Sequence, residues 1–139
     1  MSLTIRELTT ADIPELRNLA IKIFRDTFTM DNTPEAMDGL IEKDYKTSDF
    51  EREFSEPGQR YFFICDNEKG IGYLRLRKNA EADSYLGKNN IEVQRLYVEH
   101  EYHGKKVGDR LMQLAIDIAT EAGYDWIWLG VWEHNPKAQ

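Results

Sequence analysis

The sequence has a single cysteine, no long apolar run and fewer basic than acidic residues, and each scarcity excludes a class of protein. Cys65 has no second cysteine with which to form an internal disulfide, and its place in an apolar run favours a buried, unreactive thiol. No apolar stretch approaches the length of a membrane span, and the N-terminal residues lack the apolar centre of a signal peptide. We therefore expect a cytoplasmic protein that does not enter a membrane.

The charge balance argues against direct binding of nucleic acid. The chain has 25 acidic and 18 basic residues, a formal net charge of −7, whereas duplex-binding surfaces need clustered lysine and arginine. Cationic small molecules are electrostatically easier partners. With 139 residues and 41% hydrophobic content, the chain fits one globular domain over residues 1–139.

Apolar residues recur along the chain with the spacings of helices and strands. A capping-box pattern at Asp12 and Glu15 predicts the start of the first helix. The predicted elements are a strand over 3–8, helices beginning at Asp12, Asn32 and Ser48, strands over 61–65 and 71–76 joined by a turn, a mobile connection over 78–90, a strand over 91–98, a helix over 107–122 and a strand over 124–132. This order predicts an α/β (α+β) fold, a mixed sheet with helices packed on both faces.

The strand over 91–98 changes phase along its length. Ile91 and Val93 begin the apolar alternation, whereas Leu96 and Val98 end it one residue out of step, which is the pattern of a β-bulge. Gly130 interrupts the neighbouring strand. We therefore expect the two parallel strands to separate near their C-terminal ends and to leave backbone groups free.

A glycine-punctuated turn follows that strand and leads into a helix. The first N–H groups of a helix have no partner inside it, so this layout is suited to an anion such as phosphate. Gly104 and Gly108 allow close approach, and Lys105 and Lys106 add positive charge. A simple turn with solvated lysines is the alternative. A nucleoside-triphosphate loop fits poorly, because its longer glycine spacing and Lys-Ser/Thr pair are missing.

At this turn the chain resembles the GNAT family of N-acetyltransferases. Their pyrophosphate loop has Gln or Arg, two residues, Gly, one residue, and Gly or Ala; here His103, Lys106 and Gly108 stand at these positions, and the first two depart from the pattern. The surrounding sequence fits better, over residues 23–28, 95–98, 102–112 and 129–138. Over essentially its whole length the chain is similar to the PaiA-type spermidine/spermine N-acetyltransferases.

The resemblance implies acetyl-CoA as cosubstrate and no metal. Its pantetheine arm would pair with the main chain at the end of strand 91–98, and its pyrophosphate would bind the N–H groups of the turn. The implied cofactor residues are Leu96, Tyr97, Val98, His103, Gly104, Lys105, Lys106, Val107, Gly108, Asp109 and Asn135. Asn135 also fits a helix N-cap before Pro136. The three histidines, His100, His103 and His134, form no recognisable metal-binding pattern.

For the chemistry, the resemblance implies Glu92 as general base, since an attacking amine must lose a proton. An exposed strand residue is the alternative interpretation. The family continues with a helix carrying a tyrosine that acts as general acid, and then with further strands. This chain ends at Gln139, so we expect a domain without that last helix and those strands, and no general acid is carried over. Three tryptophans share one strand face and predict core packing: Trp126, Trp128 and Trp132.

Two functions follow from these observations. The first is acetyl transfer to a primary amine, with a polyamine as favoured acceptor, because of the resemblance and the net negative charge. The second is a non-catalytic, acetyl-CoA-responsive regulator that acts by protein contacts, suggested by the imperfect turn and the missing acid. The oligomeric state is left open, with a homodimer as one candidate.

Overall fold

The structure is a computed structural model that describes residues 2–28, 33–78 and 89–129. Its described part contains a five-stranded sheet in the order β1-β2-β3-β4-β5. The strands are β1 (Leu3–Glu7), β2 (Arg60–Asp66), β3 (Lys69–Arg77), β4 (Asn90–Val98) and β5 (Trp126–Leu129). Neighbours from β1 to β4 are antiparallel, and β4 and β5 are parallel. The mixed sheet expected from the sequence is therefore confirmed.

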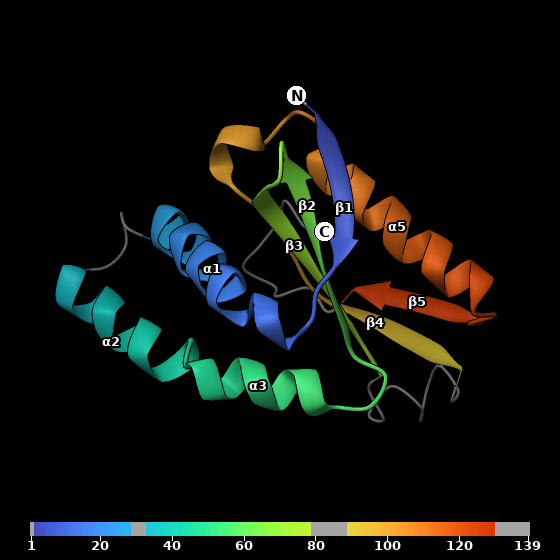
Figure 1. Cartoon of the computed structure of the whole chain (residues 1–139), viewed down its shortest axis with the longest axis horizontal. Helices are drawn as coiled ribbons and strands as arrows, with labels where there is room; N and C mark the ends of the chain where they lie inside the picture. Colours follow the sequence, from blue (N-terminus) through green and yellow to red (C-terminus); the bar gives the residue numbers. More distant parts are fainter. Residues whose placement is uncertain (1, 29–32, 79–88, 130–139) are drawn as a thin grey trace.

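Helices cover both faces of this sheet, also as expected. They are α1 (Ile13–Phe28), α2 (Pro34–Asp44), α3 (Thr47–Ser55) and α5 (Val107–Glu121), with short 3-10 helices η1 (Thr10–Asp12) and η3 (His100–Tyr102). Figure 1 shows α1, α2 and α3 on one side of the sheet and α5 on the other. Each side has its own apolar core, one beneath α1 and α3 and one beneath α5. Cys65 lies buried in the first of them, as predicted.

The predicted capping box at Asp12 and Glu15 is wrong, because the box lies one turn earlier. Thr9 is the N-cap of η1, and its backbone N–H donates to Asp12 Oδ2 at 2.8 Å. Asp12 Oδ1 accepts from Arg6 at 2.9 Å, so this carboxylate closes the preceding turn. Glu15 instead approaches Arg6 Nη2 at 3.6 Å.

The hairpin of β2 and β3 turns where the sequence predicts it. Asn67 and Glu68 connect the two strands with φ of 49° and 75°. Positive φ at both central positions is the geometry that matches the right-handed twist of the flanking strands. The hairpin places β3 in the middle of the sheet, next to β4.

The predicted bulge is present in β4. The register with β3 passes from Arg75 opposite Arg95 to Leu76 opposite Val93, so Gln94 is the extra residue. Because one residue is inserted, apolar side chains on both sides of Gln94 reach the core beneath α5. The change of phase in the sequence thus has the cause that was expected.

The parallel register of β4 and β5 runs from Asn90 opposite Trp126 to Val93 opposite Leu129. Gly130, Trp132, His134, Asn135 and the expected separation of the strands lie outside the described residues, as does most of the connection predicted over 78–90. In the described ranges, every helix is too short or too polar to cross a bilayer.

The prediction that Trp126 packs in the core is wrong, because this residue is 54% exposed. Ile127 packs on the core beneath α5, so the flanking tryptophans lie on the opposite face of the described edge strand. Trp128 is half-buried, and its Nε1–H donates to Asn90 Oδ1 at 3.1 Å.

Candidate functional site

A cavity of about 700 Å³ lies between the end of β4, the start of α5 and the C-terminal half of α1. Its lining residues are Ile23, Thr27, Leu96, Tyr97, Val98, His100, Tyr102, His103, Gly104, Lys106, Val107, Gly108 and Asp109. The structure therefore brings together the predicted cofactor residues that it describes, apart from Lys105. The Lys105 ammonium lies over the Tyr102 ring, 5.5 Å from its centroid.

The turn before α5 contains two residues in the left-handed region of φ. Gly104 has φ of 79°, and Lys106, the N-cap of α5, has φ of 62°. No side chain of the N-cap accepts a hydrogen bond from the first turn of α5. The N–H groups of that turn, beginning at Val107, thus have no side-chain cap, and Val107, Gly108 and Asp109 line the cavity. The aligned peptide dipoles favour an anion at such a helix start.

Lys106 occupies the position where the GNAT loop pattern has glycine, and its backbone is strained. A residue with a Cβ in the left-handed region costs roughly 1–2 kcal/mol of folding free energy, and glycine avoids this cost. Glycine also makes the unfolded chain more flexible, which offsets part of the gain in stability. We expect Lys106→Gly to raise the free energy of unfolding by about 0.5–1 kcal/mol in urea denaturation. Lys105→Gly is the matched control.

Lys105→Gly removes the same charge from the same turn, but Lys105 is not among the residues with positive φ. Glycine there brings only added chain entropy, so the control is expected to lose about 0.5–1 kcal/mol of stability. Equal stability changes in both variants would contradict a strained backbone at Lys106.

The first turn of α5 packs closely against the end of β4. A Cβ on Gly108 would lie 3.7 Å from Leu96 Cδ2 and 3.9 Å from Val98 Cγ2, which is ordinary contact distance. The two predicted halves of the cofactor site, strand end and helix start, are therefore adjacent in space. Their role in binding stays a prediction.

The main chain at the end of β4 has one edge on the cavity. The Glu99 N–H donates to Ile71 O at 2.9 Å, on the side of β3. Successive residues of a strand direct their N–H and C=O groups to opposite edges, so those of Val98 and Leu96 are directed away from β3. The Val98 carbonyl oxygen lies 2.8 Å from His103 Nε2. The backbone edge and the turn thus meet at His103.

Sequence reasoning missed the contribution of α1 and η3 to the cavity. Thr27 Oγ1 of α1 lies 3.1 Å from His100 Nε2, and the His100 ring stacks on His103 with centroids 4.8 Å apart. The apolar stripe of α1 was visible in the sequence, but no signal showed which edge of the sheet it would approach. Within the described ranges, no three His, Cys, Asp or Glu side chains gather as metal ligands.

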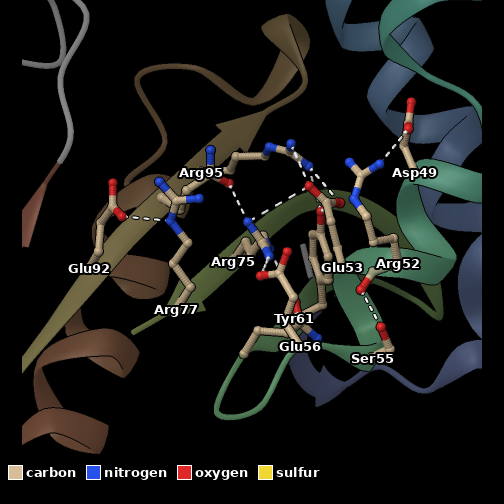
Figure 2. A network of polar contacts seen from close by, with 12 residues as sticks. Asp49, Arg52, Glu53, Ser55, Glu56, Tyr61, Arg75, Arg77, Glu92 and Arg95 are labelled. Carbon is tan, nitrogen blue, oxygen red and sulfur yellow. Dashed lines mark hydrogen bonds and ion pairs between the residues drawn. The ribbon is translucent and has the colours of Figure 1, made fainter. Parts of the chain in front are cut away.

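Glu92 is buried, with 4% of its surface exposed, so the interpretation as an exposed strand residue is wrong. Its Oε1 accepts from Arg77 Nε at 2.7 Å, as Figure 2 shows. The carboxylate precedes the bulge at Gln94, whereas the residues of β4 that line the cavity follow it. Glu92 therefore belongs to the strand that borders the cavity but is not one of the lining residues.

Glu99 adds a buried carboxyl group directly after the cavity-lining end of β4. It is 1% exposed, and its Oε2 lies 3.7 Å from Lys22 Nζ. Among the described residues, this oxygen has no hydrogen-bond partner. Burial, together with a hydrogen bond shared with Glu101, raises the pKa of Glu99.

The folded chain thus binds the Glu99 proton more tightly than the unfolded chain does. The stability that this adds is present below the ordinary glutamate pKa and is lost as pH rises through the raised pKa. We expect Glu99→Gln to remove this decline, so that its unfolding free energy exceeds that of the unmodified protein by roughly 1 kcal/mol at pH 7. Urea denaturation at pH 4 and pH 7 checks this, and an equal difference at both values would contradict it.

A network of polar side chains lies between α3 and the sheet, as Figure 2 shows. Arg95 holds the Glu53 carboxylate through two contacts, Nη1 to Oε1 at 3.1 Å and Nη2 to Oε2 at 2.7 Å. Tyr61 donates from its hydroxyl to Glu53 Oε1 at 2.8 Å. Burial raises the pKa of Tyr61 well above its ordinary value, which keeps this donor protonated. No sequence pattern predicted this network.

Comparison with known proteins shows the family of the chain. The sequence model of the acetyltransferase (GNAT) family matches residues 14–139. An uncharacterized N-acetyltransferase in the pepI 3'region of Lactobacillus delbrueckii subsp. lactis is 30% identical over 135 residues, which cover 97% of this chain and 78% of that protein.

Two solved structures have the same fold. The PaiA N-acetyltransferase from Thermoplasma acidophilum, in complex with coenzyme A, has a TM-score of 0.73 and 25% identity over 89% of this chain and 76% of its own. An aminoglycoside acetyltransferase, meta-AAC0020, from an uncultured soil metagenomic sample, in complex with sisomicin, has a TM-score of 0.71 and 17% identity over 98% of this chain and 82% of its own.

Proposed function

Since the chain belongs to the acetyltransferase (GNAT) family and is an acyl-CoA-dependent N-acetyltransferase, we propose that it acetylates a primary amine of a small molecule, with a polyamine such as spermidine or spermine as favoured acceptor. The observation that carries the proposal is the cavity at the junction of β4 and α5, lined by the end of β4 on one side and by a helix start without a side-chain cap on the other.

The residues of this junction suit the two polar parts of acetyl-CoA. The N–H groups at the start of α5 and the nearby lysine charges favour the pyrophosphate. The backbone groups of Leu96 and the N–H of Val98, which are directed away from β3, offer the pantetheine amides a strand-like partner. Gly108 leaves the first turn of α5 without a side chain between these two surfaces. When bound, acetyl-CoA supplies an activated thioester.

We propose that Glu92 takes up the proton that the amine loses as its nitrogen bonds to the acetyl carbon and the carbon–sulfur bond breaks. The Arg77 Nε–H occupies Oε1 and fixes the orientation of the carboxylate. Because Glu92 is not a lining residue, a water molecule between amine and carboxylate is the route that fits its position. The departing thiolate takes up a proton and leaves as the free thiol of coenzyme A, so that the products are an amide and a thiol.

The acceptor is proposed from charge and from the relatives. The net charge of −7 favours a cationic substrate, as polyamines are. The relative from Thermoplasma acidophilum is a PaiA N-acetyltransferase, and the soil enzyme was solved with the aminoglycoside sisomicin. Aminoglycosides are therefore the class against which polyamines should be compared.

A thiol-release assay tests the proposal. Release of free coenzyme A from acetyl-CoA is followed with spermidine, spermine, sisomicin and single amino acids, and titration calorimetry measures acetyl-CoA binding. We expect binding and the fastest release with the polyamines. Binding without release with any amine would favour the regulatory alternative, and absence of binding would overturn the cofactor site.

A further inference from the structure

We infer that Gln94 and Arg75 are positioning residues for the cosubstrate: their contact holds the β4 bulge in the register that presents Leu96 and Val98 to the cavity. The inference rests on the proposed binding of acetyl-CoA along β4. It assigns a functional role to a partly buried polar contact that lies outside the cavity itself.

The bulge is the point at which β4 changes its relation to the rest of the sheet. Before it, Val93 is opposite Leu76; after it, Arg95 is opposite Arg75. Without the extra residue, the pairing that follows would slip by one position and the later side chains would exchange faces, because side chains alternate along a strand. The orientation of the cavity-lining residues therefore depends on the bulge being held in place.

Arg75 fixes the extra residue from the neighbouring strand. Its Nη1–H donates to Gln94 Oε1 at 3.1 Å, and its side chain is only 2% exposed. The same guanidinium donates from Nη2 to Glu56 Oε2 at 2.7 Å and from Nε to Gln59 Oε1 at 3.1 Å. A guanidinium is planar with its donors in a fixed fork, so these contacts together determine where its bond to Gln94 points.

Arg95, the residue after the bulge, is held by α3. Arg95 bonds both oxygens of Glu53, and Figure 2 shows its guanidinium reaching from β4 to α3. Glu53 Oε2 also lies 3.7 Å from Arg75 Nη1. Gln94 is thus connected to α3 through Arg75, and Arg95 is connected to α3 directly through Glu53. Of these two connections, only the one made by Gln94 involves the extra residue of the bulge.

The chain offers a matched control for this inference. Gln94 and Gln59 are both acceptors of Arg75, at the same distance of 3.1 Å, but Gln59 lies between α3 and β2 and is not part of β4. Gln94→Leu and Gln59→Leu therefore remove equivalent bonds from one buried guanidinium. A purely structural role predicts the same consequences for both variants.

The experiment measures coenzyme A affinity by calorimetry and the backbone amide exchange of residues 95–98 by hydrogen exchange without ligand, on the full chain. We expect Gln94→Leu to bind about 10-fold more weakly and to exchange these amides faster, whereas Gln59→Leu changes affinity less than about 2-fold. Gln94→Glu, which keeps an acceptor for Arg75, is expected to restore most of the affinity.

Equal effects of the two leucine variants on affinity and exchange would overturn the inference. A protein that fails to bind coenzyme A without any substitution would overturn the proposed function instead. In that case the exchange measurement still decides the positioning role, because it needs no ligand: faster exchange in Gln94→Leu alone supports it, and equal exchange refutes it.

Discussion

Replacing Gly108 with glutamate is expected to abolish measurable binding of coenzyme A while the protein stays folded. The new side chain would begin 3.7 Å from Leu96 and 3.9 Å from Val98, between the helix start and the strand end. Its carboxylate would compete with the pyrophosphate for the same N–H groups and repel its charge. We expect a loss of affinity of about 100-fold or more.

The fold should tolerate this change for a physical reason. A negative charge in the first turn of a helix interacts favourably with the helix dipole, so Gly108→Glu should leave the unfolding free energy unchanged or slightly higher. Gly39→Glu is the control, because it adds the same charge to an exposed position of α2 with no atom within 4 Å of its Cβ. Equal affinities of the two variants would contradict the anion site at α5.

Replacing Glu53 with glutamine is expected to produce the largest loss of stability among the changes considered. The substitution leaves Arg95 and the buried Arg75 without the carboxylate that lies between them, at 2.7 Å and 3.7 Å. Breaking a buried ion pair by removing one partner typically costs 3–5 kcal/mol, and the 29% exposure of the Arg95 side chain places the expectation at about 3 kcal/mol.

Glu7 provides the matched control. It forms two contacts of the same kind with Arg60, at 2.9 Å and 2.8 Å, but both side chains are exposed by more than 40%. Exposed pairs contribute about 0–1 kcal/mol, so Glu7→Gln should change little. Urea denaturation measures both. Losses of similar size in the two variants would show that burial does not govern the energy of the Glu53 pair.

The sequence predicted features that depend on neighbours in the chain. The bulge was visible because one residue inserted in a strand shifts every later apolar position, and Leu96 and Val98 record that shift. The turn before α5 was visible because glycine spacing and the start of a helix lie within a few residues of each other. Those features also carried the resemblance that family membership confirms.

Features that depend on distant residues were missed. Arg95 and Glu53 are 42 positions apart, and Thr27 and His100 are 73 apart, so no local pattern links them. The position of Arg75 in an apolar strand was the one available signal of a buried network, since a charge there needs partners. The exposure of Trp126 depends on what lies beside an edge strand, which the alternation of residues does not specify.

Amide chemical-shift mapping of coenzyme A binding on the labelled full chain tests the proposed acyl-CoA site most directly. If the end of β4 and the start of α5 form the acyl-CoA site, the largest changes will occur at the amides of Leu96, Val98 and residues 104–109. Changes concentrated elsewhere in the sheet, or saturable binding that leaves these amides unmoved, would contradict the site described here.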